Sequence, residues 1–276
     1  MTNLIFNDVP LPTDPIRWPF EAIWQAIVPA LQGFTCEMLP TVDSTNTELM
    51  RRFKSGALEP TLLVAEQQSA GRGRLGRHWH GQRGGSLMFS IGLLLEPADW
   101  SGLSLAVGIS LAESLDAAHQ APARIGLKWP NDLWLTGAQA GRKLAGVLVE
   151  TASVDGLRYV VIGVGINICP VELTGQGTGQ IPPGCLQDVL PDTDAAQALQ
   201  LVVAPLVQAV QAFAQFGFAP FQARFSTRDV LAGRAVQLSD GMQGEAHGVT
   251  EAGALLVHTS AGMKEITSAE VSVRPC

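Results

Sequence analysis

The sequence predicts an α+β protein, in which a helix-backed sheet precedes a small module of short strands. Apolar segments with helical spacing and apolar segments of strand length both recur between residues 20 and 216. From Gly233 the pattern changes to five short strand-like segments separated by turn residues, which favours a small barrel-like module. Hydrophobic residues make up 46% of the 276 residues and charged residues 16%, so the chain can bury a substantial core.

Helices are predicted where apolar residues recur at helical spacing. Thr45 and Glu48 fit a capping box near the start of the second helix, and Gly56 fits its C-terminal end. Pro29 is expected to break the first helix. The predicted helices are residues 20–32, 44–56, 104–119 and 194–216.

Strands are predicted where apolar runs are short and are bounded by turn residues. Before the C-terminal module they are residues 61–67, 86–96, 125–129, 144–151 and 158–168. Within that module they are residues 235–240, 244–249, 254–259, 263–267 and 271–274. Residues 1–17 and 170–192 are expected to be irregular, and a loop as long as the second is usually functional or disordered.

Composition excludes several classes of protein. The net charge of −7 and the pI near 5.2 argue against general nucleic-acid binding, which needs a broad basic surface. No run of 18 apolar residues predicts a membrane span, and the acidic N-terminus does not resemble a secretory signal. The cysteines form no CxxC pair, so we expect reduced thiols in a cytoplasmic protein. These cysteines are Cys36, Cys169, Cys185 and Cys276.

The most informative segment is the basic, glycine-rich stretch of residues 66–85. It contains six glycines and four arginines against one acid, Glu66. Glycine loses much entropy on ordering and clustered arginines repel, so an anionic ligand held by backbone N–H groups and guanidinium groups would explain the segment. A solvated basic turn is the alternative. The arginines are Arg72, Arg74, Arg77 and Arg83.

The same segment contains a GxGxxG string, formed by Gly71, Gly73 and Gly76. Residues 77–85 cannot form the helix that a dinucleotide site requires, so this string does not indicate a Rossmann site. Trp79 is either a core residue or an aromatic platform for a base.

Two lysines follow or precede predicted strands. Lys128 ends one strand and is followed by Asn131, which places a cation and an amide at a strand edge, although the same residues suit an ordinary turn. Lys143 precedes another strand, where its ammonium group would suit a carboxylate or a phosphate, although a lone lysine is usually a surface residue. Gly163 and Gly165 allow either close ligand approach or tight packing.

Motifs for a protein nucleophile or a protein-bound metal are missing from the sequence. The five histidines show no HExxH spacing, Ser86 is not part of a GxSxG elbow, and no GxxxxGK[ST] string occurs. We therefore expect no metal site built from protein ligands alone.

Taken together and in this order, five segments resemble the biotin protein ligase family, the biotin–[acetyl-CoA-carboxylase] ligases. The segments are DSTN at 43–46, AEQQSAGRGRLGRHW at 65–79, LKWPNDL at 127–133, GRKLAGVLVE at 141–150 and VIGVGINI at 161–168. They cover about residues 40–170, and the C-terminal module extends the resemblance to Arg274.

The resemblance implies a two-step reaction. Biotin and MgATP give biotinyl-5′-AMP and pyrophosphate, and a lysine of a biotin carboxyl carrier protein then attacks the mixed anhydride. The implied biotin-binding residues are Ser44, Thr45, Asn46, Gln68, Gly71, Arg72, Lys143 and Gly146. The implied ATP-binding residues are Arg74, Arg77, Trp79 (stacked on adenine), Lys128, Asn131 and Asn167. The implied catalytic residues are Lys143, Arg74, Arg72 and Lys128.

Loop movement is also implied by the resemblance. Arg72, Arg74 and Arg77 would lie in a loop that closes over the adenylate and protects it from water. Residues 173–184 match the family's adenine-covering loop in position only.

The resemblance further implies a mixed β-sheet backed by helices, the class II synthetase-like biotin/lipoate ligase fold, with a small C-terminal SH3-like β-barrel. We expect an N-terminal extension at 1–35, a catalytic domain at 36–230 and the SH3-like domain at 231–276. Some family members carry an N-terminal DNA-binding module. Fewer than 45 residues precede the motifs here, and this segment is acidic, so we expect no DNA binding. We expect either a monomer or a homodimer.

Three other functions remain open from the sequence alone. A lipoate–protein ligase would share the fold and the adenylation chemistry. A non-catalytic biotin sensor would need a recognition module that the sequence does not reveal. A nucleic-acid-binding loop is disfavoured by the net charge of −7.

Overall fold

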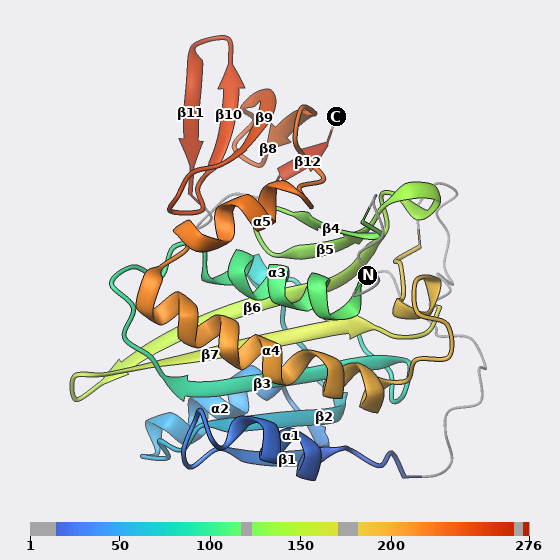
Figure 1. The fold of residues 1–276 in the computed structure, drawn as a ribbon, viewed down its shortest axis with the longest axis vertical. Coiled ribbons are helices and arrows are strands. Elements are labelled where there is room, and N and C mark those ends of the chain that lie inside the picture. The colour runs from blue at the N-terminus through green and yellow to red at the C-terminus, as the bar shows by residue number, and fades with distance from the viewer. Residues whose placement is uncertain (1–14, 117–122, 171–181, 268–272, 276) are drawn as a thin grey trace.

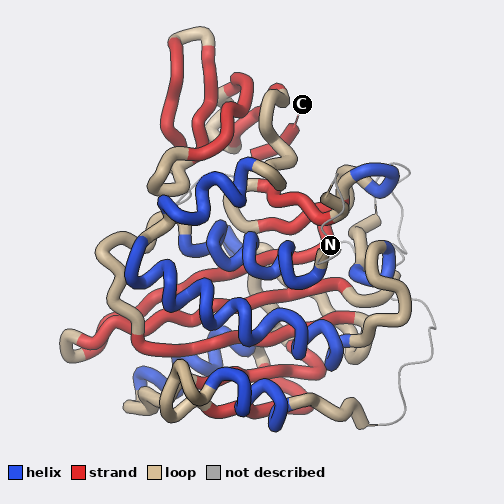
Figure 2. The backbone as a smooth tube through the Cα atoms, viewed as in Figure 1, coloured by secondary structure: helices blue, strands red, loops and turns tan. Residues whose placement is uncertain are grey.

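The computed structural model describes residues 15–116, 123–170, 182–267 and 273–275, which form two β-sheets with flanking helices (Figures 1 and 2). The larger sheet has seven strands in the order β1-β2-β3-β7-β6-β5-β4. Strands β1 and β2 are parallel and the other neighbours are antiparallel, so the sheet is mixed, as expected. Its strands are β1 (Thr35–Val42), β2 (Thr61–Gln68), β3 (Ser86–Leu94), β4 (Ile125–Lys128), β5 (Asp132–Leu135), β6 (Lys143–Val154) and β7 (Leu157–Asn167).

Helices cover both faces of this sheet (Figure 1). Successive strand residues point to opposite faces: on β7, Val160 and Ile162 join the main core, whereas Tyr159 and Val161 pack against Phe53. The continuous apolar run of β7 is therefore explained by burial on two faces. The first face carries α1 (Phe20–Ile27), α3 (Leu103–Leu115) and α4 (Ala195–Phe216), and the second carries α2 (Thr45–Lys54).

The capping box expected at Thr45 and Glu48 is wrong. Ser44 is the N-cap of α2, and its Oγ accepts a hydrogen bond from the backbone N–H of Thr47 at 3.5 Å. Glu48 pairs instead with two arginines one turn further along, so its carboxylate is not available to a cap. The C-terminal end of α2 agrees with the prediction, since Gly56 follows it with a φ of 96°.

The longest helix, α4, is long and apolar enough to cross a membrane by length and composition alone. Its Leu199, Leu206 and Phe213 are completely buried in the main core. The core helix of a folded domain passes the same test, so this is weak evidence for a span.

The second sheet contains the five strands expected in the C-terminal module. Among the described residues it is open and antiparallel, in the order β11-β10-β9-β8-β12, with β11 and β12 at its edges. Short helix α5 (Gln222–Ser226) leads into it at the top of Figure 1. The buried indole of Trp129 donates to Gly253 O at 3.0 Å and so links the two sheets. The strands are β8 (Ala235–Leu238), β9 (Gln243–Val249), β10 (Leu255–Thr259), β11 (Gly262–Ile266) and β12 (Val273–Pro275).

Candidate functional site

A pocket with about 980 Å³ of empty space, counting its open mouth, lies on the α2 side of the large sheet. Gly146 of β6 and Gly163 and Gly165 of β7 are among the residues that line it. A Cβ atom on Gly163 would lie 2.2 Å from Asn46 Oδ1, and one on Gly165 would lie 2.3 Å from the Trp79 ring. These two approaches require glycine, so Gly163 and Gly165 serve tight packing against side chains of the protein, and close approach of a ligand stays a prediction.

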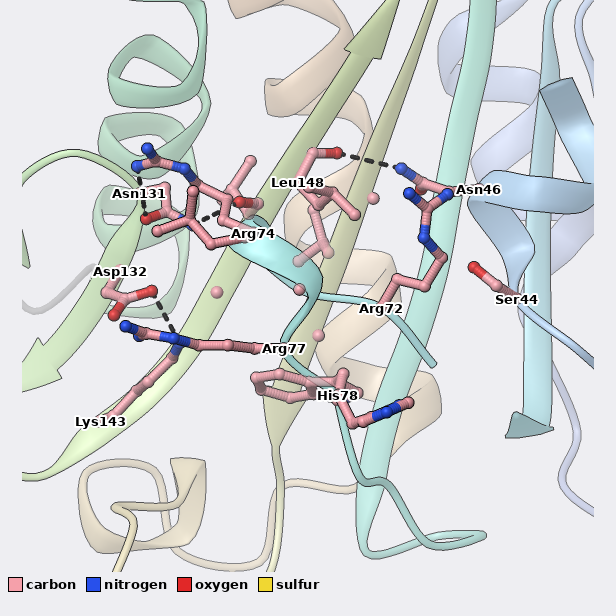
Figure 3. A pocket seen from close by; sticks show the side chains of 18 of the residues that line it. Ser44, Asn46, Arg72, Arg74, Arg77, His78, Asn131, Asp132, Lys143 and Leu148 are labelled. Carbon is pink, nitrogen blue, oxygen red and sulfur yellow. Dashed lines mark hydrogen bonds and ion pairs between the residues drawn. The ribbon is translucent and has the colours of Figure 1, made fainter. Parts of the chain in front are cut away.

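One wall of the pocket is the basic, glycine-rich segment that connects β2 to β3. Its centre is a single 3₁₀ turn, Arg74–Gly76, in which Leu75 and Gly76 adopt left-handed φ angles of 54° and 69°. No helix follows this turn within the described residues 77–85, in agreement with the rejection of a Rossmann site. Figure 3 shows this segment crossing the mouth of the pocket, with its arginines directed toward the lining.

Part of the segment's positive charge is already paired. Arg72 Nη1 lies 3.0 Å from Glu150 Oε1, and Arg83 Nε lies 2.8 Å from Glu66 Oε2. Arg74 Nη1 donates to Asn131 Oδ1 at 3.4 Å, from the 3₁₀ turn to the β4–β5 hairpin.

The end of the pocket beside α2 is polar, and the charge of Arg72, which also lines the pocket, is paired there with Glu150. Thr45 N donates to Gln68 Oε1 at 2.8 Å, which fixes the amide of Gln68 at the end of β2. Ser44, Thr45 and Asn46 come from the first turn of α2 and are each 3% exposed although they line the pocket. This end can therefore accept and donate hydrogen bonds without attracting a charge.

The opposite end is cationic, and its groups come from the β4–β5 hairpin, the start of β6 and the 3₁₀ turn. Lys143 Nζ lies 2.7 Å from Asp132 Oδ1, and Lys128 Nζ lies 4.2 Å from the centroid of the Trp134 ring. Burial lowers the pKa of Arg74, an effect that Asp132 opposes and Arg77 reinforces. A group of cations that is partly desolvated in this way is stabilised by an anionic ligand.

The Trp79 side chain lies between these ends, against Gly165 of β7, with Lys143 Nζ 5.7 Å from its ring centroid. Its indole Nε1 is buried and has no hydrogen-bond partner among the described residues. A buried donor without a partner is costly in a folded protein, so this atom also indicates a ligand site.

Most of the residues predicted to form the site line this pocket. They are Ser44, Thr45, Asn46, Gln68, Arg72, Arg74, Arg77, Trp79, Lys128, Asn131, Lys143 and Gly146. Two predicted residues do not. Gly71 lies behind the wall, where a Cβ atom would be 2.4 Å from Trp79 O, and Asn167 Nδ2 donates to Gly184 O at 3.0 Å. Both hold the pocket's surroundings in place and do not form its lining.

Asp132 and His78 were not among the predicted site residues, yet both line the pocket. Asp132 lies directly opposite Lys128 in the β4–β5 register and opposite Gly146 in the β5–β6 register. The available signal in the sequence was that Asp132 follows the candidate lysine Lys128 across a turn. Strand β5 was not predicted, because it begins directly after that turn.

The described part of the chain contains no group of three or more His, Cys, Asp or Glu side chains that could hold a metal ion. Cys36, Cys169 and Cys185 are free, as expected, and burial raises the pKa of Cys36 and of Cys185 to about 11. Cys276 and most of the expected 173–184 loop lie outside the described residues.

Comparison with known proteins gives matches to both parts of the chain. Residues 38–167 match the biotin/lipoate A/B protein ligase family, and residues 232–274 match the biotin protein ligase C-terminal domain. The bifunctional ligase/repressor BirA of Escherichia coli is 36% identical over 259 residues, which are 90% of this chain and 77% of the relative. The biotin–[acetyl-CoA-carboxylase] ligase of Paracoccus denitrificans is 31% identical over 245 residues, which are 85% of this chain and 98% of the relative.

Solved structures give the same result. The biotin protein ligase of Aquifex aeolicus, in complex with biotin and ATP, matches with a TM-score of 0.71 and 31% identity, covering 88% of this chain and 99% of that one. The apo form of the same ligase matches with a TM-score of 0.68.

Proposed function

The chain belongs to the biotin protein ligase family, and on this premise we propose that the pocket on the α2 side of the sheet is where biotin and ATP react. The protein is an ATP-dependent biotin ligase: it activates biotin and transfers it to a lysine of a carrier protein. The observation that supports this location for the reaction is the difference between the two ends of the pocket. The end beside α2 is polar, and the end beside the β4–β5 hairpin is cationic.

In the first half-reaction, a carboxylate oxygen of biotin attacks the α-phosphorus of ATP, a P–O bond forms, and pyrophosphate leaves. Both reactants are anions that repel each other, so cations must bring them together. Lys143 suits the biotin carboxylate and the α-phosphate, and Arg74, Arg77 and Lys128 suit the remaining phosphate oxygens. Positioning and charge stabilisation then account for the rate without a protein nucleophile.

Magnesium arrives with ATP and is not held by the protein alone. It prefers oxygen ligands and is commonly held by one or two carboxylates together with substrate phosphates. Asp132 and Asn131 provide a carboxylate and an amide oxygen at the cationic end, so the residues present fit the ion. When bound, Mg²⁺ neutralises phosphate charge.

In the second half-reaction, the amine of a carrier lysine attacks the carbonyl of biotinyl-AMP, an amide bond forms, and AMP leaves. The partner is a biotin carboxyl carrier protein, as the names of the relatives imply. We propose residues 36–230 as the catalytic domain and 231–276 as an SH3-like module that packs on it. The contact of Trp129 with Gly253 joins this module to the hairpin that bears Lys128.

Biotin is favoured over lipoate by the chemistry of the polar end beside α2. Biotin's head is a cyclic urea with N–H donors and a carbonyl acceptor, whereas the dithiolane ring of lipoate has neither. Gln68 Oε1 already accepts from Thr45 N, but the Ser44 hydroxyl and the Gln68 NH₂ group would find no acceptor on an apolar ring, and burying such donors unpaired is costly. The match of residues 232–274 to a biotin protein ligase domain points the same way.

ATP–pyrophosphate exchange tests this function. The purified chain is assayed with biotin, with lipoate and with no acid. We expect exchange with biotin only. Exchange with lipoate alone would assign the chain to lipoate activation. A folded protein that shows no exchange with either acid would leave the function of a non-catalytic biotin sensor.

A further inference from the structure

The turn at residues 129–131, between β4 and β5, belongs to the cationic end of the pocket. Lys128 and Asp132 flank the turn and Asn131 is part of it, and all three line the pocket. The two strands have only four residues each, and β4 is the last strand in the order of the large sheet. The turn also contains Pro130, which has no N–H group to donate. Contacts from other parts of the chain are therefore needed to fix its position.

On the pocket side, the amide of Asn131 is held in one orientation. Asn131 Nδ2 donates to Val147 O at 2.7 Å, and Val147 N donates to Asn131 O at 2.9 Å. Since a backbone carbonyl can only accept, Asn131 Oδ1 must face the other way, where Arg74 Nη1 donates to it at 3.4 Å (Figure 3). The turn thus presents an oriented amide oxygen at the end proposed for the phosphates of ATP.

Away from the pocket, the two preceding residues of the turn are each held by one hydrogen bond. Ser104 Oγ, in the first turn of α3, donates to Pro130 O at 3.0 Å. The indole of Trp129, which is 1% exposed, donates to Gly253 O in the β9–β10 turn at 3.0 Å. Neither Ser104 nor Gly253 lines the pocket. Each residue of the 129–131 turn is therefore held by a different element.

The start of α3 and the β9–β10 turn also contact each other. Gly102 is the N-cap of α3, and a Cβ atom on Gly253 would lie 2.8 Å from Gly102 Cα. Gly253 has a φ of 80°, a conformation that favours glycine. The 129–131 turn, the start of α3 and the C-terminal sheet therefore meet at one place, so a shift of one requires the others to adjust.

We propose that Ser104 is a positioning residue for the activation of biotin: through Pro130 O it holds the 129–131 turn where Lys128 and Asn131 meet the phosphates of ATP. Ser104 lies outside the pocket lining, so it acts through the turn and not on a substrate. Biotin's own site does not depend on it, since the polar end beside α2 is built from other elements. This inference rests on the proposed function, because it assigns the phosphates to the cationic end.

Equilibrium binding tests the proposal without turnover. ATP is replaced by its α,β-methylene analogue, in which a carbon bridge takes the place of the oxygen that would leave with pyrophosphate. Calorimetry measures the affinity of the analogue, with Mg²⁺, for the biotin-saturated chain. The variants are Ser104→Ala, which removes the donor, and Ser104→Thr, which keeps a hydroxyl. The control is Ser110→Ala on the same helix, whose buried hydroxyl has no hydrogen-bond partner among the described residues.

In Ser104→Ala, Pro130 O loses its donor and the turn is free to shift. We expect the analogue to bind about tenfold more weakly, while the affinity for biotin alone stays within about twofold. Ser104→Thr should restore the affinity for the analogue to within about threefold, and Ser110→Ala should leave it unchanged. In pyrophosphate exchange, the KM for ATP should rise and the KM for biotin should not.

Trp129→Phe provides a second measurement, because it removes the indole N–H and keeps an aromatic ring. If Ser104 and Trp129 hold the same turn, their effects on the affinity for the analogue are coupled, and the double variant differs from the sum of the single ones. Additive losses would contradict a shared role in placing the turn.

The proposal is wrong if folded Ser104→Ala binds the analogue as tightly as the unaltered chain, or if it loses affinity for biotin to the same degree. The predicted loss of analogue binding, in a chain that shows no pyrophosphate exchange, would contradict the proposed catalytic function and leave this inference standing. An unaltered chain that does not bind the analogue would contradict both.

Discussion

At the scale of single residues, Lys143 has the most direct predicted role in the reaction. Its ammonium lies 2.7 Å from Asp132 and faces both the pocket and the Trp79 ring. In Lys143→Ala, two anionic substrates meet with one cation fewer, so we expect biotin-dependent pyrophosphate exchange to fall about 10²–10³-fold while the chain stays folded. The matched control is Lys54→Ala, an exposed lysine at the end of α2, which should keep full activity. Unchanged exchange in Lys143→Ala would remove this residue from the mechanism.

Arg74 has a different predicted role, because it joins the glycine-rich segment to the β4–β5 hairpin through its hydrogen bond to Asn131. In Arg74→Ala, this connection and a cation near the phosphates are lost. We expect biotinyl-AMP to dissociate about tenfold faster or more, measured by trapping the released adenylate. Arg234→Ala, an exposed arginine of the C-terminal module, is the control. An unaltered release rate would count against a lid function for the glycine-rich segment.

The sequence predicted the charged residues of the site better than its geometry. Lysine and arginine in glycine-rich or turn motifs are conspicuous in a chain of net charge −7. Gly71 and Asn167 do not line the pocket, because a motif does not distinguish a lining residue from one that packs behind the lining.

At the scale of secondary-structure elements, the glycines of β7 determine how closely Asn46 and Trp79 lie against the sheet. In Gly165→Ala, the new Cβ would lie 2.3 Å from the Trp79 ring, which must then move. We expect exchange activity to fall about 100-fold, since small displacements of positioning groups have effects of this size. Gly85→Ala is the control, because its Cβ meets nothing nearer than 3.6 Å. Full activity in Gly165→Ala would show that the position of Trp79 is unimportant.

Long apolar elements were predicted from the sequence, and short or edge elements were not. Strands β3 and β7 and helices α3 and α4 are close to their predicted ranges because burial on two sides makes them almost continuously apolar. Strand β1 was missed because it is a partly exposed edge strand. Strand β5 was missed because its four residues directly follow a turn. In both cases the sheet, and not the local sequence, determines the strand.

At the scale of the whole molecule, Asp116 joins parts of the chain that are distant in sequence. Its Oδ2 accepts from Arg124 N at 2.8 Å and lies 2.9 Å from Arg228 Nη1, so it connects α3, β4 and the segment that leads to the C-terminal sheet. Burial alone would raise the pKa of Asp116, but the hydrogen bonds from Arg228 and from the Ile125 and Arg124 N–H groups together lower it.

This lowered pKa predicts a pH-dependent contribution to stability. The stabilisation is fully present above the ordinary carboxyl pKa and is lost as the pH falls through the lower pKa of the folded state. In Asp116→Asn, Arg228 is left with an uncompensated buried charge, so we expect the free energy of unfolding at pH 7 to fall by about 3 kcal/mol. Urea titration at pH 7 and in acid measures it.

The difference between Asp116→Asn and the unaltered chain should shrink in acid, because the unaltered carboxylate then takes up a proton. Asp155→Asn, at an exposed turn, should change the stability by less than about 0.5 kcal/mol at either pH. A difference that is equal at both pH values would exclude the ionised carboxylate as the source of the stabilisation.

The most direct test of the central claim is the transfer of biotin to a carrier. The purified chain is incubated with biotin, MgATP and a biotin carboxyl carrier domain, and the mass of the carrier is measured. We expect the carrier to gain one biotinyl group on a single lysine, only when both biotin and ATP are present. A carrier of unchanged mass after incubation with a folded, biotin-binding protein would contradict its assignment as a ligase.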